Sequence, residues 1–126
     1  MSDRLLQYDF TAMTTIYHNP RCGTSRSALE LLQGRGIQPD IVEYLKTPLS
    51  RAALASLIRD AGLSPREAIR SKEALFAELK LDGPAVTNDQ LLDAMAEHPI
   101  LMNRPFVVTD KGTRLCRPAT VLEEIL

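Results

Sequence analysis

The sequence contains no tryptophan, only two cysteines and no long apolar run. Two thiols are too few for a disulfide-stapled scaffold or a four-thiolate zinc site. No segment approaches the roughly 20 apolar residues that cross a bilayer, so a membrane-spanning protein is not expected. The first residues mix charge and apolar side chains and do not resemble a secretory signal. We therefore expect a cytoplasmic protein with reduced thiols.

An excess of charge of either sign is also missing. Lys and Arg number 15 against 16 Asp and Glu, which leaves a net charge of -1. This balance provides no electrostatic case for binding nucleic acid or an anionic membrane. With 126 residues, of which 44% are hydrophobic, the chain has the composition of an ordinary globular domain. We expect one domain over residues 14–126, preceded by an extension over residues 1–13.

The pattern at the start predicts a strand, a helix and a second strand. Residues 14–17 are β-branched and aromatic, residues 24–33 carry an apolar stripe, and residues 41–45 again read as a strand. A βαβ unit places its two strands parallel to each other.

The middle of the chain is expected to be helical. Leucine, isoleucine and alanine recur at helical spacing over residues 54–61. Ser64–Glu67 and Thr87–Gln90 have the form of capping boxes, and Pro65 suits the first helical position. His98 precedes a proline, so we interpret it as the end of a helix and not as a metal ligand.

The last part returns to strand. Residues 105–109 and 113–116 predict a hairpin, and Pro118 opens a final helix. The predicted class is α/β, with a helical segment between an N-terminal βαβ unit and a C-terminal ββα unit.

Cys22 is the residue that most strongly suggests chemistry. It stands in the loop between the first strand and the first helix, where unpaired N–H groups stabilise a thiolate. Thiols so placed beside cations can have pKa values lowered from about 8.5 to between ~3.5 and 7.5. Arg21, Arg26 and, when protonated, His18 are the nearby cations. The next three residues leave room for an oxyanion and can donate hydrogen bonds to it: Gly23, Thr24 and Ser25.

A half-buried structural thiol would occupy the same position. The residues at fixed spacing from Cys22 therefore have to show which reactive-cysteine motif, if any, is present. A dithiol redox pair needs a cysteine at position 25, where Ser25 stands. A tyrosine-phosphatase loop, C-x5-R, needs arginine at position 28, where Ala28 stands. What remains is a single nucleophilic cysteine at an anion site, which must draw its electrons from another molecule.

Four motifs together resemble the glutaredoxin-linked arsenate reductases. They are IYHNPRCGTSR at 16–26, SPREAIR at 64–70, HPILMNRPFVVT at 98–109 and GTRLCRP at 112–118. The resemblance runs from about residue 14 to residue 126. The first motif is shared with wider relatives, including transcription regulators, and the combination is more specific.

The resemblance implies a thioredoxin-like fold with a helical insert. It implies that Cys22 is the nucleophile that reduces arsenate and that His18 favours its thiolate. It further implies that three arginines bind the oxyanion, namely Arg70, Arg104 and Arg117. Glutathione is the implied co-substrate and glutaredoxin the implied reductant, with no bound cofactor and no metal.

Two further expectations concern the second cysteine and a proline. Thioredoxin-like folds commonly carry a cis proline facing the reactive cysteine, so we predict a cis Arg104–Pro105 bond. Cys116 follows Leu115 on a predicted strand and reads as a packed apolar thiol, although a resolving role stays open. His18 and Cys22 alone are too few to hold a metal.

Two other functions compete with arsenate reduction. One is a thioredoxin-like binding protein that acts on transcription machinery without catalysis. The complete set of arginines disfavours it, because an interaction module needs no oxyanion ligands. The other is a general reductase of glutathione mixed disulfides.

Overall fold

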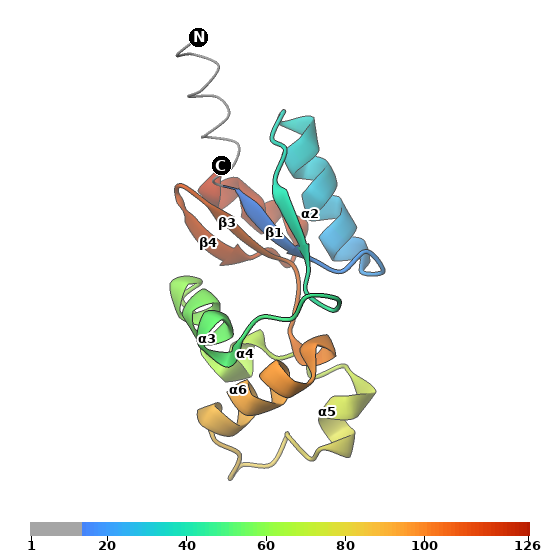
Figure 1. Cartoon of the computed structure of the whole chain (residues 1–126), viewed down its shortest axis with the longest axis vertical. Coiled ribbons are helices and arrows are strands. Elements are labelled where there is room, and N and C mark those ends of the chain that lie inside the picture. The colour runs from blue at the N-terminus through green and yellow to red at the C-terminus, as the bar shows by residue number, and fades with distance from the viewer. Residues whose placement is uncertain (1–13) are drawn as a thin grey trace. The chain divides into compact units, whose positions relative to one another are not determined.

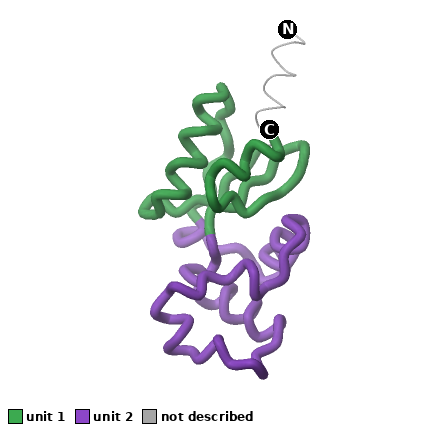
Figure 2. The backbone as a smooth tube through the Cα atoms, turned by 180° about the vertical axis from the view of Figure 1, so that it is seen from behind, with its two compact units in different colours: residues 1–43, 104–126 green, residues 44–103 purple. Residues whose placement is uncertain are grey.

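The computed structural model describes residues 14–126, so the predicted extension over residues 1–13 lies outside the described part. The chain forms two compact units, shown in different colours in Figure 2. Within the described part, one unit combines residues 14–43 with Arg104–Leu126, and the other is Tyr44–Asn103. Chain segments that are distant in sequence thus complete the first unit.

The first unit is built on a four-stranded sheet. Its strands are β1 (Thr15–His18), β2 (Asp40–Glu43), β3 (Phe106–Thr109) and β4 (Gly112–Leu115), in the order β2-β1-β3-β4. β1 runs parallel to β2, as the βαβ pattern predicted, and antiparallel to β3. β3 and β4 form the expected hairpin, with Thr109 opposite Gly112. The sheet therefore joins the N-terminal and C-terminal parts of the chain at the β1–β3 pair.

Two helices complete this unit, α2 (Gly23–Gly34) and the 3-10 helix η2 (Ala119–Ile125), and Figure 1 shows α2 beside the sheet. The apolar stripe of α2 is buried against the inward residues of β1 and β3 and against η2. The fully or almost fully buried core residues are Ile16, Ala28, Leu32, Val107, Cys116, Leu122 and Ile125. Pro118 opens the final helix as predicted, but its turns are of the tighter 3-10 type, beginning with the Val121 N–H bonded to the Pro118 carbonyl at 3.0 Å.

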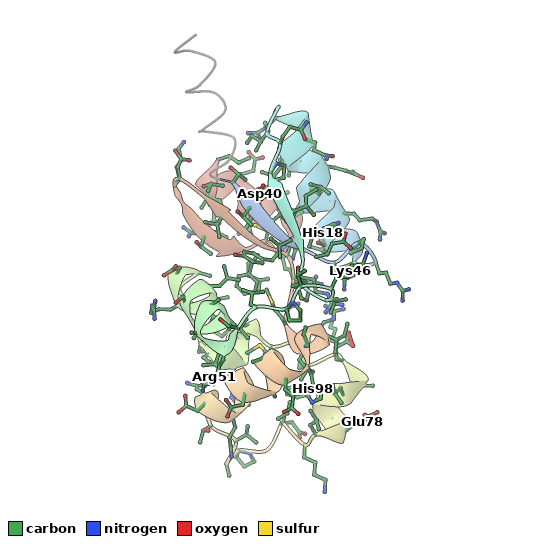
Figure 3. All side chains as sticks on the ribbon, in the orientation of Figure 1. His18, Asp40, Lys46, Arg51, Glu78 and His98 are labelled. Carbon is green, nitrogen blue, oxygen red and sulfur yellow. The ribbon has the colours of Figure 1, made fainter. Side chains whose placement is uncertain are left out.

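The second unit is helical. Its elements are α3 (Arg51–Asp60), α4 (Pro65–Ala68), α5 (Ala74–Glu78), α6 (Asn88–Glu97) and the 3-10 helix η1 (Pro99–Leu101). Both predicted capping boxes are present, with Ser64 capping α4 and Thr87 capping α6. His98, labelled in Figure 3, is the C-cap of α6, which confirms its interpretation as a helix-terminal residue.

The structure confirms the thioredoxin-like α/β class, and strand and helix limits differ from the predicted ones by a residue or two. The Arg104–Pro105 bond is cis, as predicted, and the Arg117–Pro118 bond is cis as well, which was not anticipated. No helix within residues 14–126 has the length and apolar character that crossing a membrane requires.

Candidate active site

The loop between β1 and α2 is held by its own hydrogen bonds. The Asn19 carbonyl accepts the Cys22 N–H at 3.0 Å, and the Asn19 Oδ1 accepts the Arg21 N–H at 3.0 Å. Asn19 is itself buried. These bonds place Cys22 at the N-cap of α2 with an extended backbone, φ -91° and ψ 122°. The sulfur is thereby carried at the positive end of the helix.

Ser25 ties the first turn of α2 to the end of β1. Its Oγ lies 2.6 Å from Nδ1 of His18 and accepts the Asn19 N–H at 3.1 Å. His18, labelled in Figure 3, is the last residue of β1, and both side chains are buried. The Ser25 hydroxyl is therefore engaged inside the loop. Ser25 presents its backbone N–H to the Cys22 sulfur, and its contact with an oxyanion stays a prediction.

The environment of Cys22 favours its thiolate. Partial burial by itself would raise the pKa of the thiol. The backbone N–H of Ser25, the guanidinium groups of Arg117 and Arg104, and the backbone N–H of Thr24 outweigh burial, so the pKa of Cys22 is lowered. The two N–H groups do not reach the geometry of a formed capping hydrogen bond, yet each stabilises negative charge on the sulfur. Cys22 is thus poised to react as an anion.

A main-chain carbonyl holds the guanidinium of Arg117 near this sulfur. Its Nη1 lies 3.5 Å from Sγ of Cys22 and donates to the carbonyl of Arg104 at 2.9 Å. One Nη1 carries two hydrogens, so a single nitrogen can serve both acceptors. The side chain of Arg104 is 6% exposed and also stabilises the Cys22 thiolate. The structure therefore brings two of the three predicted arginines to Cys22.

The surroundings of His18 favour the neutral form of its ring. Burial, assisted by the charge of Arg26 and opposed by Glu43, lowers the pKa of its imidazole below the ordinary value. The ring is therefore neutral at neutral pH. It has no direct hydrogen bond to Cys22 in the described part of the chain and reaches the sulfur only through Ser25.

The third predicted arginine, Arg70, belongs to the helical unit. Its Nη1 lies 3.5 Å from Oδ1 of Asn103, and its Nε lies 3.6 Å from Oε1 of Glu73. The side chain is only 22% exposed. These neighbours orient the guanidinium within its own unit, and its placement beside Cys22 stays a prediction.

The second cysteine is a packed thiol, as interpreted. Cys116 is 0% exposed within the core of the first unit. Burial, reinforced by the charge of Glu124, raises the pKa of Cys116 to about 12. Because only thiolates attack disulfides or adducts, Cys116 is unsuited to a resolving role.

A metal centre would need at least three suitable side chains. Within residues 14–126, no group of three His, Cys, Asp or Glu residues lies close enough to hold an ion. The candidate site is therefore built from one sulfur, backbone N–H groups and guanidinium groups.

A sequence model of the ArsC family matches residues 17–125. The chain belongs to the ArsC family. Among ArsC proteins it is 59% identical over 112 residues to the arsenate reductase of Rhizobium meliloti strain 1021, covering 89% of this chain and 80% of that one. It is 52% identical over 112 residues to an arsenate reductase of Escherichia coli, covering 89% and 79%.

A solved ArsC relative shows that the likeness extends to three dimensions. The arsenate reductase from Vibrio cholerae superposes with a TM-score of 0.86 at 44% identity, covering 91% of this chain and 99% of that one. The described fold is thus shared over nearly the whole of that relative.

The lowered pKa of Cys22 predicts its reactivity with pH. We expect the alkylation rate of Cys22 by iodoacetamide to reach half its maximum below the ordinary thiol midpoint of about 8.5, because the rate follows the thiolate fraction. Peptide mass spectrometry over a pH series measures this, and the buried Cys116 in the native protein serves as the unreactive control. A midpoint at or above that of a free thiol would contradict the prediction.

Proposed function

We propose that this ArsC protein is an arsenate reductase that uses Cys22 as its single nucleophile. The observation that carries the proposal is the contact of Arg117 with the Cys22 sulfur, 3.5 Å apart at the N-terminus of α2. A thiolate held by a permanent cation is both a ready nucleophile and the edge of an anion site. The relatives named as arsenate reductases support arsenate as the oxyanion.

Arsenate is a tetrahedral, phosphate-like oxyanion. The planar donor forks of Arg104 and Arg117 suit its oxygens, and the charge of arginine is permanent. Arg70 is the third arginine that the resemblance assigns to the oxyanion. The backbone N–H groups of Thr24 and Ser25 face the Cys22 sulfur, where they would also stabilise a developing negative charge.

The first proposed step forms a covalent adduct. The Cys22 thiolate attacks arsenic, a sulfur–arsenic bond forms, and one arsenic–oxygen bond breaks. The departing oxygen takes up protons and leaves as water, so arsenic remains pentavalent. The buried, neutral His18 acts indirectly in this step, by holding Ser25 and hence the turn that faces the sulfur.

The second proposed step needs an external thiol, because the chain has two cysteines and Cys116 is buried with a raised pKa. Glutathione attacks the adduct at the Cys22 sulfur. A disulfide forms, the sulfur–arsenic bond breaks, and its electron pair passes to arsenic, which leaves as trivalent arsenite. Glutaredoxin then reduces the mixed disulfide and restores Cys22. A cycle that depends on reduced thiols and glutathione suits the reducing cytoplasm that we expect from the sequence.

Steady-state turnover tests the proposal directly. The purified protein should convert arsenate to arsenite only when glutathione and glutaredoxin are both supplied. A general thiol reductase would instead reduce a glutathione mixed disulfide without arsenate, and a non-enzymatic regulator would turn over neither. Absence of arsenite in the complete mixture would overturn the proposed function.

Replacing the buried thiol should leave turnover intact. We expect Cys116→Ala to retain the arsenate reductase activity of the parent protein with glutathione and glutaredoxin, because Cys116 is 0% exposed and held neutral by its raised pKa. The smaller side chain lowers stability, so the assay is run well below the melting temperature of the variant. Loss of turnover in a folded Cys116→Ala protein would restore the resolving role.

A further inference from the structure

A polar groove opens in the first unit, directly beside Cys22. It is an open surface groove with a volume of about 490 Å³. We call it the α2 groove, and its walls are Gly23, Thr24, Arg26, Ser27, Glu30, Pro118 and Ala119. Small-molecule sites typically have volumes of about 300–1,000 Å³, so the α2 groove has room for a molecule the size of a tripeptide.

Two residues that line the groove are chain neighbours of the Cys22–Arg117 pair. Gly23 directly follows Cys22 in the chain, and Pro118 directly follows Arg117. The side chains of Cys22 and Arg117 touch at 3.5 Å. A molecule in the groove therefore contacts residues that adjoin Cys22 and Arg117 in the chain.

The charged walls of the groove have opposite signs. Arg26 and Glu30 are both exposed and stand one helical turn apart on α2. The guanidinium of Arg26 donates through Nη1 to the Pro20 carbonyl at 2.9 Å, and its Nη2 lies close to Gly23. Within residues 14–126, the carboxylate of Glu30 makes no hydrogen bond or ion pair, so it is available to an incoming cation.

We propose that the α2 groove binds the small thiol that resolves Cys22, with a carboxylate of the thiol on Arg26 and its ammonium group on Glu30. The assignment rests on the proposed function, which requires an external thiol. A guanidinium and a carboxylate side by side match a zwitterion, and glutathione is a zwitterionic thiol. Neutral thiols lack both contacts, and thiols with one charge make one of them.

The bound thiolate attacks the sulfur of Cys22. On the arsenic adduct the sulfur–sulfur bond forms as the sulfur–arsenic bond breaks, and arsenic takes the electron pair. On a Cys22 mixed disulfide the attack forms a new sulfur–sulfur bond and expels the other thiolate. The second reaction needs no arsenic, so it probes the groove independently of the substrate.

Release of thionitrobenzoate from Cys22 provides the test. The protein is first converted to its Cys22–thionitrobenzoate disulfide with Ellman's reagent. Four thiols then attack it: glutathione, 3-mercaptopropionate with a carboxylate only, cysteamine with an ammonium only, and neutral 2-mercaptoethanol. The appearance of the thionitrobenzoate anion, the better leaving group, gives each rate constant. Dividing the rate for each variant by that of the unmodified sequence removes differences in intrinsic thiol reactivity.

The two variants should distinguish the contribution of each charge to the reaction rate. We expect Arg26→Gln to slow glutathione and 3-mercaptopropionate by about two- to fivefold, the effect of one exposed charge pair, and to spare cysteamine. We expect Glu30→Gln to slow glutathione and cysteamine similarly and to spare 3-mercaptopropionate. The rate with 2-mercaptoethanol should hold in both, which shows that the Cys22 loop is undisturbed.

Two matched variants serve as controls. Arg35→Gln removes an arginine that follows the other end of α2, and Asp110→Asn removes an exposed carboxylate from the β3–β4 hairpin. Both should react like the unmodified sequence with all four thiols. If both groove variants react with all four thiols at the rates of the unmodified sequence, the assignment is overturned. If thionitrobenzoate release depends on these charges but the protein reduces no arsenate, only the proposed substrate is overturned.

Discussion

Cys22→Ser is expected to lower arsenate reduction to the rate measured without enzyme. A serine hydroxyl remains protonated at neutral pH, so it neither attacks arsenic nor forms a disulfide with the resolving thiol. The arginines and helix N-terminus would still be present, and arsenate would still bind. Arsenite production with glutathione and glutaredoxin measures the loss.

Folding must be shown to survive this substitution. Cys22 is only partly buried, and serine is a favourable N-cap residue, so the stability of α2 should be kept or raised. Circular dichroism and thermal unfolding check this. A folded Cys22→Ser protein with undiminished activity would remove Cys22 as the nucleophile.

Arg117→Gln should have the second largest effect. It removes the donor 3.5 Å from the Cys22 sulfur and one proposed ligand of arsenate. Loss of one preorganised donor to a developing anion typically costs ~10²–10³-fold in rate, and we expect a loss of that order in kcat/KM for arsenate. The alkylation midpoint of Cys22 should also move to higher pH, because a group that lowers the pKa of the thiol is gone.

A neighbouring arginine provides the control for Arg117→Gln. Arg114 lies on β4 and pairs on the surface with Glu124 at 3.2 Å. Arg114→Gln should change neither the kinetics nor the alkylation midpoint. Arg117→Lys, which keeps the charge but lacks the planar fork, should fall between the two glutamine variants. An unchanged midpoint in Arg117→Gln would contradict the role given to Arg117.

Local structure followed from the sequence because its causes lie within a few residues. The capping boxes at Ser64 and Thr87 satisfy helix N–H groups three positions away, and both are present. The apolar stripe of α2 and the two strands of the first βαβ unit were likewise visible as periodicity. The same short-range reasoning placed Cys22 immediately before a helix. It missed Asn19, whose contacts with the backbone of that loop leave no periodic signal.

The residues of the candidate site could not be predicted from local sequence pattern alone. No physical rule in the sequence distinguishes Arg104 or Arg117 from other arginines, and motif resemblance selected them. The contact of Arg117 with Cys22 spans 95 residues and depends on the pairing of β1 with β3 and of β3 with β4. The lowered pKa of His18 could not be predicted from the sequence for a related reason, since burial causes it and only packing determines burial.

The sequence by itself determined that Cys22 would stand at the start of a helix, and it predicted that electrons would come from another molecule. Hydrogen bonds between near neighbours and the count of cysteines are enough for those conclusions. Tertiary structure alone decided that Arg117 meets the sulfur, that Ser25 acts through its backbone and that Cys116 is sealed in the core. These outcomes depend on which distant segments pack together and on the solvent that their packing excludes.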